Sequence, residues 1–196
     1  MDGPGHLDLR ALPPYPANSQ VRVSTWRTMD PFIVATAQYL PILVPVVAVV
    51  IWLTLPRREK VGLAAQAVLA VVVVLALIQL AAALHTDPRP FVVDPSLRPL
   101  FAHPADNGFP SDHTALSATV ALLVLRYRRA LGAALLAASV LGGAARVAAH
   151  VHHVQDIVGG LLVAVVAVAL VSAGWHAARR VHGHTAAAAG GLRASD

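Results

Sequence analysis

The stretch VGLAAQAVLAVVVVLALIQLAAAL, residues 61–84, contains only two polar side chains, Gln66 and Gln79. A helix needs about 20 consecutive apolar residues to cross the hydrocarbon core of a bilayer. No charged residue interrupts this run, and the core of a water-soluble protein of 196 residues rarely requires so long an aliphatic segment. The stretch therefore predicts a membrane-spanning helix, and with it an integral membrane protein.

Four further apolar segments lie at about residues 32–55, 114–125, 130–149 and 157–178. The first contains Pro41 and Pro45, which should kink a helix and leave carbonyl groups that need partners from neighbouring helices. The segment 114–125 is short for a span, so we expect its start to be inserted into the protein at a site. Gly159-Gly160 opens the last segment and favours close helix packing. The sequence predicts an all-α, polytopic membrane helical bundle with about five transmembrane helices.

The composition agrees with one membrane domain. Of the 196 residues, 57% are hydrophobic and 13% are charged, and the mean hydropathy is +0.64. The net charge of +5 comes from short Lys/Arg clusters between apolar runs, so we do not expect nucleic acid as a partner. The chain has no cysteine, which excludes disulfides, a thiolate nucleophile and Cys-based metal sites.

Composition predicts the domain limits, and charge predicts the topology. We expect a membrane domain at 31–180, an N-terminal tail or interfacial helical segment at 1–30, and a disordered C-terminal tail at 181–196.

Basic clusters follow alternate segments: Arg57-Arg58-Glu59-Lys60, Arg126-Tyr127-Arg128-Arg129 and Arg179-Arg180. Such connections stay in the cytoplasm, so the connections 85–113 and 147–156 should face outward. This predicts a multi-pass plasma-membrane protein whose site lies on the extracytoplasmic side.

Three polar clusters lie on or beside the outward connections. They are Arg89-Pro90, Pro110-Ser111-Asp112-His113, and Arg146 with His152 and Asp156. Arginine or histidine at a membrane boundary is costly to bury, so several together indicate a functional site. A helix that begins near Ser111 directs unpaired N–H groups toward an anion, and Arg89 and Arg146 can hold phosphoryl oxygens. The clusters therefore predict a phosphate-binding site.

The same clusters contain groups that can break a phosphate ester. His152 and Asp156 are four residues apart, so the carboxylate can hold the imidazole in one tautomer. An oriented neutral histidine can attack phosphorus and form a phosphoenzyme. A second histidine, His113, can protonate the departing oxygen. These residues predict an enzyme that removes phosphate from a lipid at a membrane surface.

Taken in order, the three motifs resemble the signature of the type 2 phosphatidic acid phosphatase superfamily. The stretches Asp87-Pro88-Arg89-Pro90-Phe91 and Phe109-Pro110-Ser111-Asp112-His113-Thr114 are similar to the bacterial undecaprenyl-diphosphate phosphatases of the bacitracin-resistance type. The resemblance implies a helical bundle with its site near one membrane face and no metal cofactor. It also implies hydrolysis of a polyprenyl (undecaprenyl-type) diphosphate, which would recycle the lipid carrier of cell-wall synthesis and confer bacitracin resistance.

The resemblance assigns a role to each motif residue. It implies that His152 is the nucleophile, that Asp156 orients it, and that His113 acts first as acid and then as base. It further implies that Arg89, Ser111 and Arg146 hold the phosphate. Hydrolysis would release the monophosphate and inorganic phosphate through a phosphohistidine intermediate.

The chain departs from the superfamily pattern at three positions. Ala82 stands where the first motif has a lysine, and Gln79, one turn earlier, could donate a neutral hydrogen bond in its place. Asp112 stands where the second motif usually has glycine, although the undecaprenyl branch resembles this sequence there. Ala145 replaces the serine that opens the third motif, which removes one potential hydrogen bond to phosphate.

Two alternatives remain open at this point. Within the same chemistry, the substrate could be phosphatidylglycerophosphate or phosphatidate. A non-enzymatic alternative is a His-rich metal-binding membrane protein, because imidazole and carboxylate groups suit zinc. Its candidate ligands are His85, His103, His150, His152, His153 and Asp156. The metal alternative leaves Arg89 and Arg146 unexplained, since both would repel a cation. The oligomeric state is not predicted.

Overall fold

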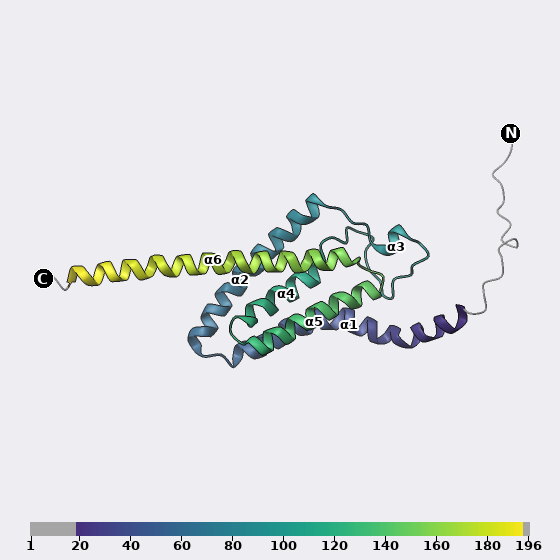
Figure 1. Cartoon of the computed structure of the whole chain (residues 1–196), viewed down its shortest axis with the longest axis horizontal. Coiled ribbons are helices and arrows are strands. Elements are labelled where there is room, and N and C mark those ends of the chain that lie inside the picture. Colours follow the sequence, from purple (N-terminus) through teal and green to yellow (C-terminus); the bar gives the residue numbers. More distant parts are fainter. Residues whose placement is uncertain (1–18, 194–196) are drawn as a thin grey trace, which may run out of the picture.

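The structure is a computed structural model that describes residues 19–193, with side-chain positions from Met29 to Arg180. The described residues form helices and, apart from an isolated bridge between Pro88 and Asn107, no β-structure. The helices are α1 (Ser19–Leu53), α2 (Arg57–Leu84), α3 (Pro90–Val93), α4 (Asp112–Leu125), α5 (Arg129–Ala148) and α6 (Val154–Arg193), as shown in Figure 1. The bundle confirms the all-α prediction.

Among the described residues, four helical stretches are long and apolar enough to cross a membrane. They are Met29–Leu53, Arg57–Leu84, Arg129–Ala148 and Val154–Arg180, and α4 is a fifth, shorter apolar helix. Large aliphatic side chains on these helices point away from the bundle; Val50, Val72 and Leu162, for example, are exposed. Lipid can cover such faces, because the helices satisfy their own backbone hydrogen bonds. The chain is a multi-pass membrane protein.

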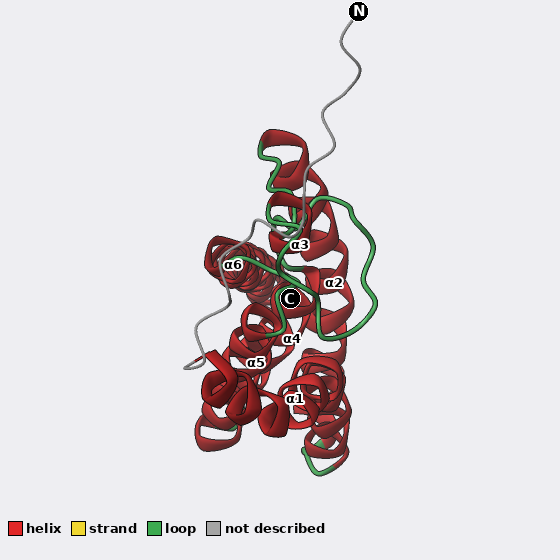
Figure 2. Cartoon of the chain, turned by 90° about the vertical axis from the view of Figure 1, so that its right-hand side faces the viewer, coloured by secondary structure: helices red, strands yellow, loops and turns green. Residues whose placement is uncertain are grey.

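The short helix α4 lies at the centre of the bundle. It packs against α1, α2, α5 and α6, and Figure 2 shows it surrounded by them in a view along the bundle. Its Ala115, Ala118 and Ala121 are completely buried, and such small side chains allow neighbouring helices to approach closely. Its start is also inside the protein, with Ser111 and Thr114 almost inaccessible. This burial confirms the expectation drawn from the shortness of the segment.

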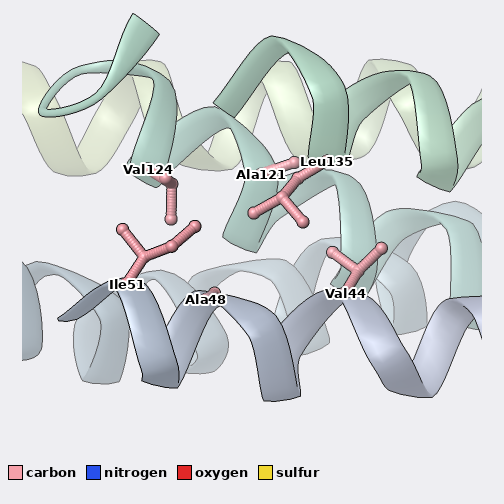
Figure 3. Packing of buried hydrophobic residues seen from close by; sticks show 6 residues of the cluster. All are labelled: Val44, Ala48, Ile51, Ala121, Val124 and Leu135. Atoms are coloured by element: carbon pink, nitrogen blue, oxygen red, sulfur yellow. The ribbon is translucent and has the colours of Figure 1, made fainter. Parts of the chain in front are cut away.

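One layer of the core joins the first, fourth and fifth helices. Val44, Ala48 and Ile51 of α1 face Ala121 and Val124 of α4 and Leu135 of α5 (Figure 3). The three α1 residues recur at helical spacing, so they line one face of that helix. This layer holds α1 against the central helix and so fixes its position relative to the rest of the bundle.

The glycine pair at the start of α6 allows the closest helix contact near the site. A Cβ atom added at Gly160 would lie 2.7 Å from the carbonyl oxygen of Ser111, and one at Gly159 would lie 2.4 Å from the ring of Phe109. Residues with side chains could not adopt this packing without a shift. The predicted close approach at Gly159-Gly160 is confirmed, and it brings α6 against the start of α4.

The far end of α4 carries a separate polar network. Arg126 donates to Oε1 of the buried Gln66 at 2.8 Å and also to the hydroxyl of Ser172. The Gln66 amide in turn donates to the Tyr127 hydroxyl at 2.8 Å. One of the basic clusters, Arg126-Tyr127-Arg128-Arg129, therefore lies at the opposite end of α4 from Ser111.

The helices extend beyond some of the predicted limits. Helix α1 begins at Ser19, and residues 1–18 of the predicted N-terminal segment lie outside the described residues. We expected a disordered tail at 181–196, but α6 continues as a helix to Arg193, and residues 194–196 lie outside the described part.

Candidate active site

Three connections meet at one end of the bundle. The α2–α3 loop joins the α3–α4 loop where Gly108 N donates to Asp87 O at 2.8 Å. The α3–α4 loop joins the end of α5 where Leu100 N donates to Ala149 O at 3.1 Å. The start of α4 joins α6 where Ser111 N donates to Asp156 O at 3.0 Å. These bonds bring the three sequence motifs together.

His152 and Asp156 form a buried pair in the turn that leads into α6. Nδ1 of His152 lies 3.1 Å from Oδ2 of Asp156, and the two residues are 2% and 0% exposed. The same carboxylate oxygen accepts the backbone N–H of His153 at 2.8 Å, which fixes its direction. Burial lowers the pKa of His152, against the opposing effect of its hydrogen bond to Asp156, so the imidazole is neutral at pH 7. Its Nδ1–H donates to the carboxylate and its Nε2 keeps a lone pair.

Arg89 approaches the other nitrogen of this ring. Its Nη1 lies 3.3 Å from Nε2 of His152 and donates to the carbonyl of Val151 at 2.7 Å. Its Nε donates to Asp106 at 2.8 Å, and the Asp106 side chain is 60% exposed. Arg89 itself is 5% exposed. The guanidinium is thus fixed beside Nε2 of His152, and its outer partner, Asp106, is exposed.

Arg146 lies in the last turn of α5 and approaches the site through His103. Its Nη2 lies 3.0 Å from Nε2 of His103, whose ring centroid is 6.0 Å from that of His152. Its Nη1 donates to the backbone carbonyl of Ala37 in α1 at 3.2 Å. Its Nε is buried and has no hydrogen-bond partner within the described residues. Arg146 therefore retains N–H groups that can donate hydrogen bonds to an anion.

The start of α4 completes the site. Ser111 is the N-cap, and its hydroxyl accepts from Thr114 N at 3.4 Å. The Asp112 carboxylate accepts the His113 backbone N–H at 2.7 Å and lies 2.8 Å from His113 Nδ1. The Asp112 carboxylate is thus paired with His113. Both candidate catalytic histidines, His113 and His152, pair Nδ1 with an aspartate and leave Nε2 for chemistry.

The arrangement suits phosphoryl transfer, and a family comparison agrees with it. Residues 60–180 match the PAP2 superfamily. The chain belongs to the PAP2 superfamily. It is accordingly a hydrolase that acts on phosphate esters, as the sequence resemblance implied.

Individual relatives and a solved structure support this placement. The PAP2 chain is 29% identical over 143 residues to the bacitracin transport permease protein BcrC of Bacillus licheniformis, covering 73% of this chain and 70% of the relative. It is 30% identical over 140 residues to the undecaprenyl-diphosphatase BcrC of Bacillus subtilis (strain 168), covering 70% of each. The crystal structure of Aquifex aeolicus LpxE matches with a TM-score of 0.60 and 25% identity, over 74% of this chain and 85% of that one.

Asn107 ties the end of α2, near Ala82, to the loops of the site. The carbonyl of Ala82 accepts from the Asn107 side-chain amide at 3.3 Å, and His85 O accepts from the same group at 3.1 Å. Asn107 Oδ1 accepts the backbone N–H groups of Asp87 and Phe109 at 2.9 and 3.0 Å. Gln79 is exposed on α2, so its predicted role as a substitute donor stays a prediction without a supporting contact.

Two residues next to the PAP2 motifs were not predicted as part of the site. Asp106 binds Arg89, and Asp87 accepts from Gln155 Nε2 at 2.5 Å and lies 2.9 Å from His153 Nδ1. Asp87 could have been suspected from its place in Asp87-Pro88-Arg89-Pro90-Phe91, whereas Asp106 has no local sequence signal. A third, His103, was considered only as a metal ligand, yet it contacts Arg146.

Among the described residues, two candidate ligands of the metal-binding alternative, His153 and Asp156, lie close together, and their third neighbour is Asp87, which was not a candidate. Ligand atoms of Asp87, His153 and Asp156 lie within 4.8 Å of one another. His153 and Asp87 already pair with each other, and Asp156 already holds His152. The remaining histidines have separate partners: His85 packs on Phe109, His103 contacts Arg146, and His150 contacts the carbonyl of Arg98. The described histidines therefore do not form one common ligand set.

Proposed function

We propose that this PAP2 protein hydrolyses a polyprenyl (undecaprenyl-type) diphosphate to the monophosphate and inorganic phosphate through a phosphohistidine on His152. The observation that carries the proposal is the environment of this ring. Its Nδ1 is held by Asp156 at 3.1 Å and its Nε2 lies 3.3 Å from the cationic Arg89. The substrate class is supported by the relative named as an undecaprenyl-diphosphatase.

The first step forms the phosphoenzyme. The lone pair on His152 Nε2 attacks the terminal phosphorus, and the N–P bond forms as the bond to the bridging oxygen breaks. Protonated His113 gives its Nε2 proton to that oxygen, which leaves on the polyprenyl monophosphate. Asp156 stabilises the positive charge that develops on the His152 ring, because its carboxylate accepts the Nδ1–H.

The second step releases phosphate. His113, now neutral, takes a proton from a water molecule that attacks the phosphorus of the phosphohistidine. The N–P bond breaks, its electron pair returns to His152 Nε2, and inorganic phosphate leaves. Together, the two steps return the enzyme to its starting protonation state.

Fixed positive groups stabilise the charge on the transferring phosphoryl group. Arg89 and Arg146 are 5% and 3% exposed, so they act where water screens little. The start of α4 adds the positive end of the helix dipole next to Ser111. An entering phosphoryl group would take over the Arg89 N–H that now points to His152. The proposed steps need no metal ion.

We also propose that the site faces the extracytoplasmic side of the plasma membrane. The site lies at the start of α4, while the basic cluster beginning at Arg126 lies at its other end. Positively charged connections favour the cytoplasm, so the site end favours the outside. A lipid diphosphate released there would be returned to carrier form for cell-wall synthesis, in keeping with the names of the two relatives, a bacitracin transport permease protein and an undecaprenyl-diphosphatase.

The test is phosphate release by the purified protein from a panel of polyprenyl diphosphates, phosphatidylglycerophosphate and phosphatidate. We expect the polyprenyl diphosphates to be hydrolysed fastest and His152→Ala to lack turnover. Substrate labelled in the terminal phosphate should leave an acid-labile label on the wild-type protein and none on His152→Ala. A preference for phosphatidate would overturn the proposed substrate but not the mechanism, whereas full activity of His152→Ala would overturn the mechanism.

A further inference from the structure

Helix α1 contributes to the site although it lies outside the matched family region. The superfamily match covers residues 60–180, whereas α1 ends at Leu53. Its backbone nevertheless reaches the phosphate-binding arginine, because the carbonyl of Ala37 accepts from Arg146 Nη1 at 3.2 Å. The contact joins residues separated by 109 positions in the chain, and it raises the question of why a helical carbonyl is free to make it.

Pro41 makes this carbonyl available. In an α-helix the carbonyl of a residue accepts the N–H of the residue four positions later. The residue four positions after Ala37 is Pro41, and proline has no N–H to donate. Ala37 is completely buried, so water cannot satisfy the freed oxygen, and an unpaired buried carbonyl is unfavourable. Arg146, itself 3% exposed, supplies the missing donor.

Gly142 lets the two helices approach closely enough for this bond. It lies one turn before Arg146 on α5, and a Cβ atom added there would be 3.3 Å from Pro41 Cγ and 3.4 Å from Pro41 Cδ. The proline ring therefore packs directly on the glycine backbone. The ring and the carbonyl that it frees face α5 one turn apart, so the same packing places the oxygen beside Arg146.

We propose that Pro41 is a positioning residue for Arg146, acting through the freed carbonyl of Ala37. The Ala37 carbonyl accepts from Nη1 of Arg146 on the α1 side, while Nη2 of Arg146 lies 3.0 Å from Nε2 of His103. The guanidinium plane is then fixed from two sides, and its remaining N–H groups are left for a phosphoryl group. This inference rests on the proposed role of Arg146 in phosphate binding, and it extends the site to a helix outside the family motifs.

The test is Pro41→Ala, with Pro45→Ala as the matched control in the same helix. Pro41→Ala restores an N–H that competes with Arg146 for the Ala37 carbonyl. We expect about tenfold weaker binding of inorganic phosphate and a KM raised by a similar factor, the size typical of one hydrogen bond to a charged group. Thermal stability should not fall, because removing proline from a helix interior favours the helix. Pro45→Ala should leave both constants within about twofold of wild type, because Pro45 frees a different carbonyl.

A double-mutant cycle separates positioning from general damage to the fold. If Pro41 acts through Arg146, Pro41→Ala should weaken phosphate binding much less in an Arg146→Lys background than in the wild type. Equal losses in both backgrounds, or an equal loss in Pro45→Ala, would overturn the proposal. If Pro41→Ala does not fold, Gly142→Ala tests the same contact, because its Cβ pushes Pro41 away; unchanged phosphate affinity there would also overturn it.

Inorganic phosphate as the probe keeps this test separate from the identity of the lipid. Failure of every polyprenyl diphosphate in the substrate panel would remove the proposed substrate and leave the Pro41 result standing. Normal phosphate binding by Pro41→Ala, together with polyprenyl diphosphate hydrolysis, would remove the positioning role and leave the proposed function standing.

Discussion

Arg89 Nη1 lies 3.3 Å from His152 Nε2, although the two residues are 63 positions apart in the chain. A guanidinium can only donate, so Nε2 must accept and the ring proton must lie on Nδ1, toward Asp156. Arg89 and Asp156 therefore both favour the same tautomer of the His152 ring. That tautomer is the one in which Nε2 can attack phosphorus.

The pH dependence of activity should follow His152. Burial, the largest effect, lowers the pKa of His152 below its ordinary value of 6.5. Attack requires the neutral ring, so activity is lost as the pH falls and the ring becomes protonated. We expect the acidic limb of the kcat/KM profile to be centred below pH 6.5, measured as phosphate release across the pH range.

His103 provides the control for that pH profile. Burial, with smaller contributions from Arg89 and Arg146, lowers the pKa of His103 to about 4, so it stays neutral over the range measured. His103→Gln should therefore leave the acidic limb where it is, even if it raises KM. An acidic limb centred at or above pH 6.5 in the wild type would contradict a buried neutral nucleophile.

Asp112→Asn should slow the chemical step. The Asp112 carboxylate lies 2.8 Å from Nδ1 of the His113 ring and accepts the His113 backbone N–H at 2.7 Å, and an amide stabilises the protonated ring less than a carboxylate does. We expect kcat to fall by about tenfold to a hundredfold, within the range for general acid catalysis, with little change in KM. Steady-state phosphate release measures both constants, and a change confined to KM would instead indicate a role in binding.

Gly160→Ala should damage the site by separating two helices. Its Cβ would lie 2.7 Å from the backbone oxygen of Ser111, so α6 or the start of α4 must shift. We expect a loss of about 1–3 kcal/mol in stability and a clear loss of activity, measured by thermal unfolding in detergent and phosphate release. Gly174→Ala is the matched control, because nothing lies within 4 Å of its added Cβ. It should be neutral or slightly stabilising, and equal damage from both substitutions would contradict the packing argument.

The proposed topology can be tested with single cysteines, since the chain has none of its own. A cysteine at Asp94, in the exposed part of the α3–α4 connection, should react with a membrane-impermeant reagent in intact cells. A cysteine at Arg58, at the basic start of α2, should react only after permeabilisation. The opposite pattern would place the site in the cytoplasm.

The all-α membrane fold could be predicted from local patterns in the sequence. Long aliphatic runs such as residues 61–84 require a spanning helix wherever they occur, because the bilayer leaves few other ways to satisfy the backbone. The pairing of His152 with Asp156 was also accessible, because the two residues are only four positions apart, although His152 lies in the turn before α6 and not inside the helix. Each of these inferences depends on interactions within one segment of the chain or between residues close together in the sequence.

The tertiary structure alone decided which distant groups support the site. The sequence marked Pro41 as a source of a free carbonyl, but only helix packing could assign that carbonyl to Arg146. Likewise Asp106 reaches Arg89 and His103 reaches Arg146 because a loop folds over the end of the bundle. Hydrogen bonds between such groups depend on the relative placement of whole helices, which is set by the packing of small residues such as Gly142 and Gly160. The pair Gly159-Gly160 indicated a close helix contact, but the sequence did not show which part of the chain it would meet.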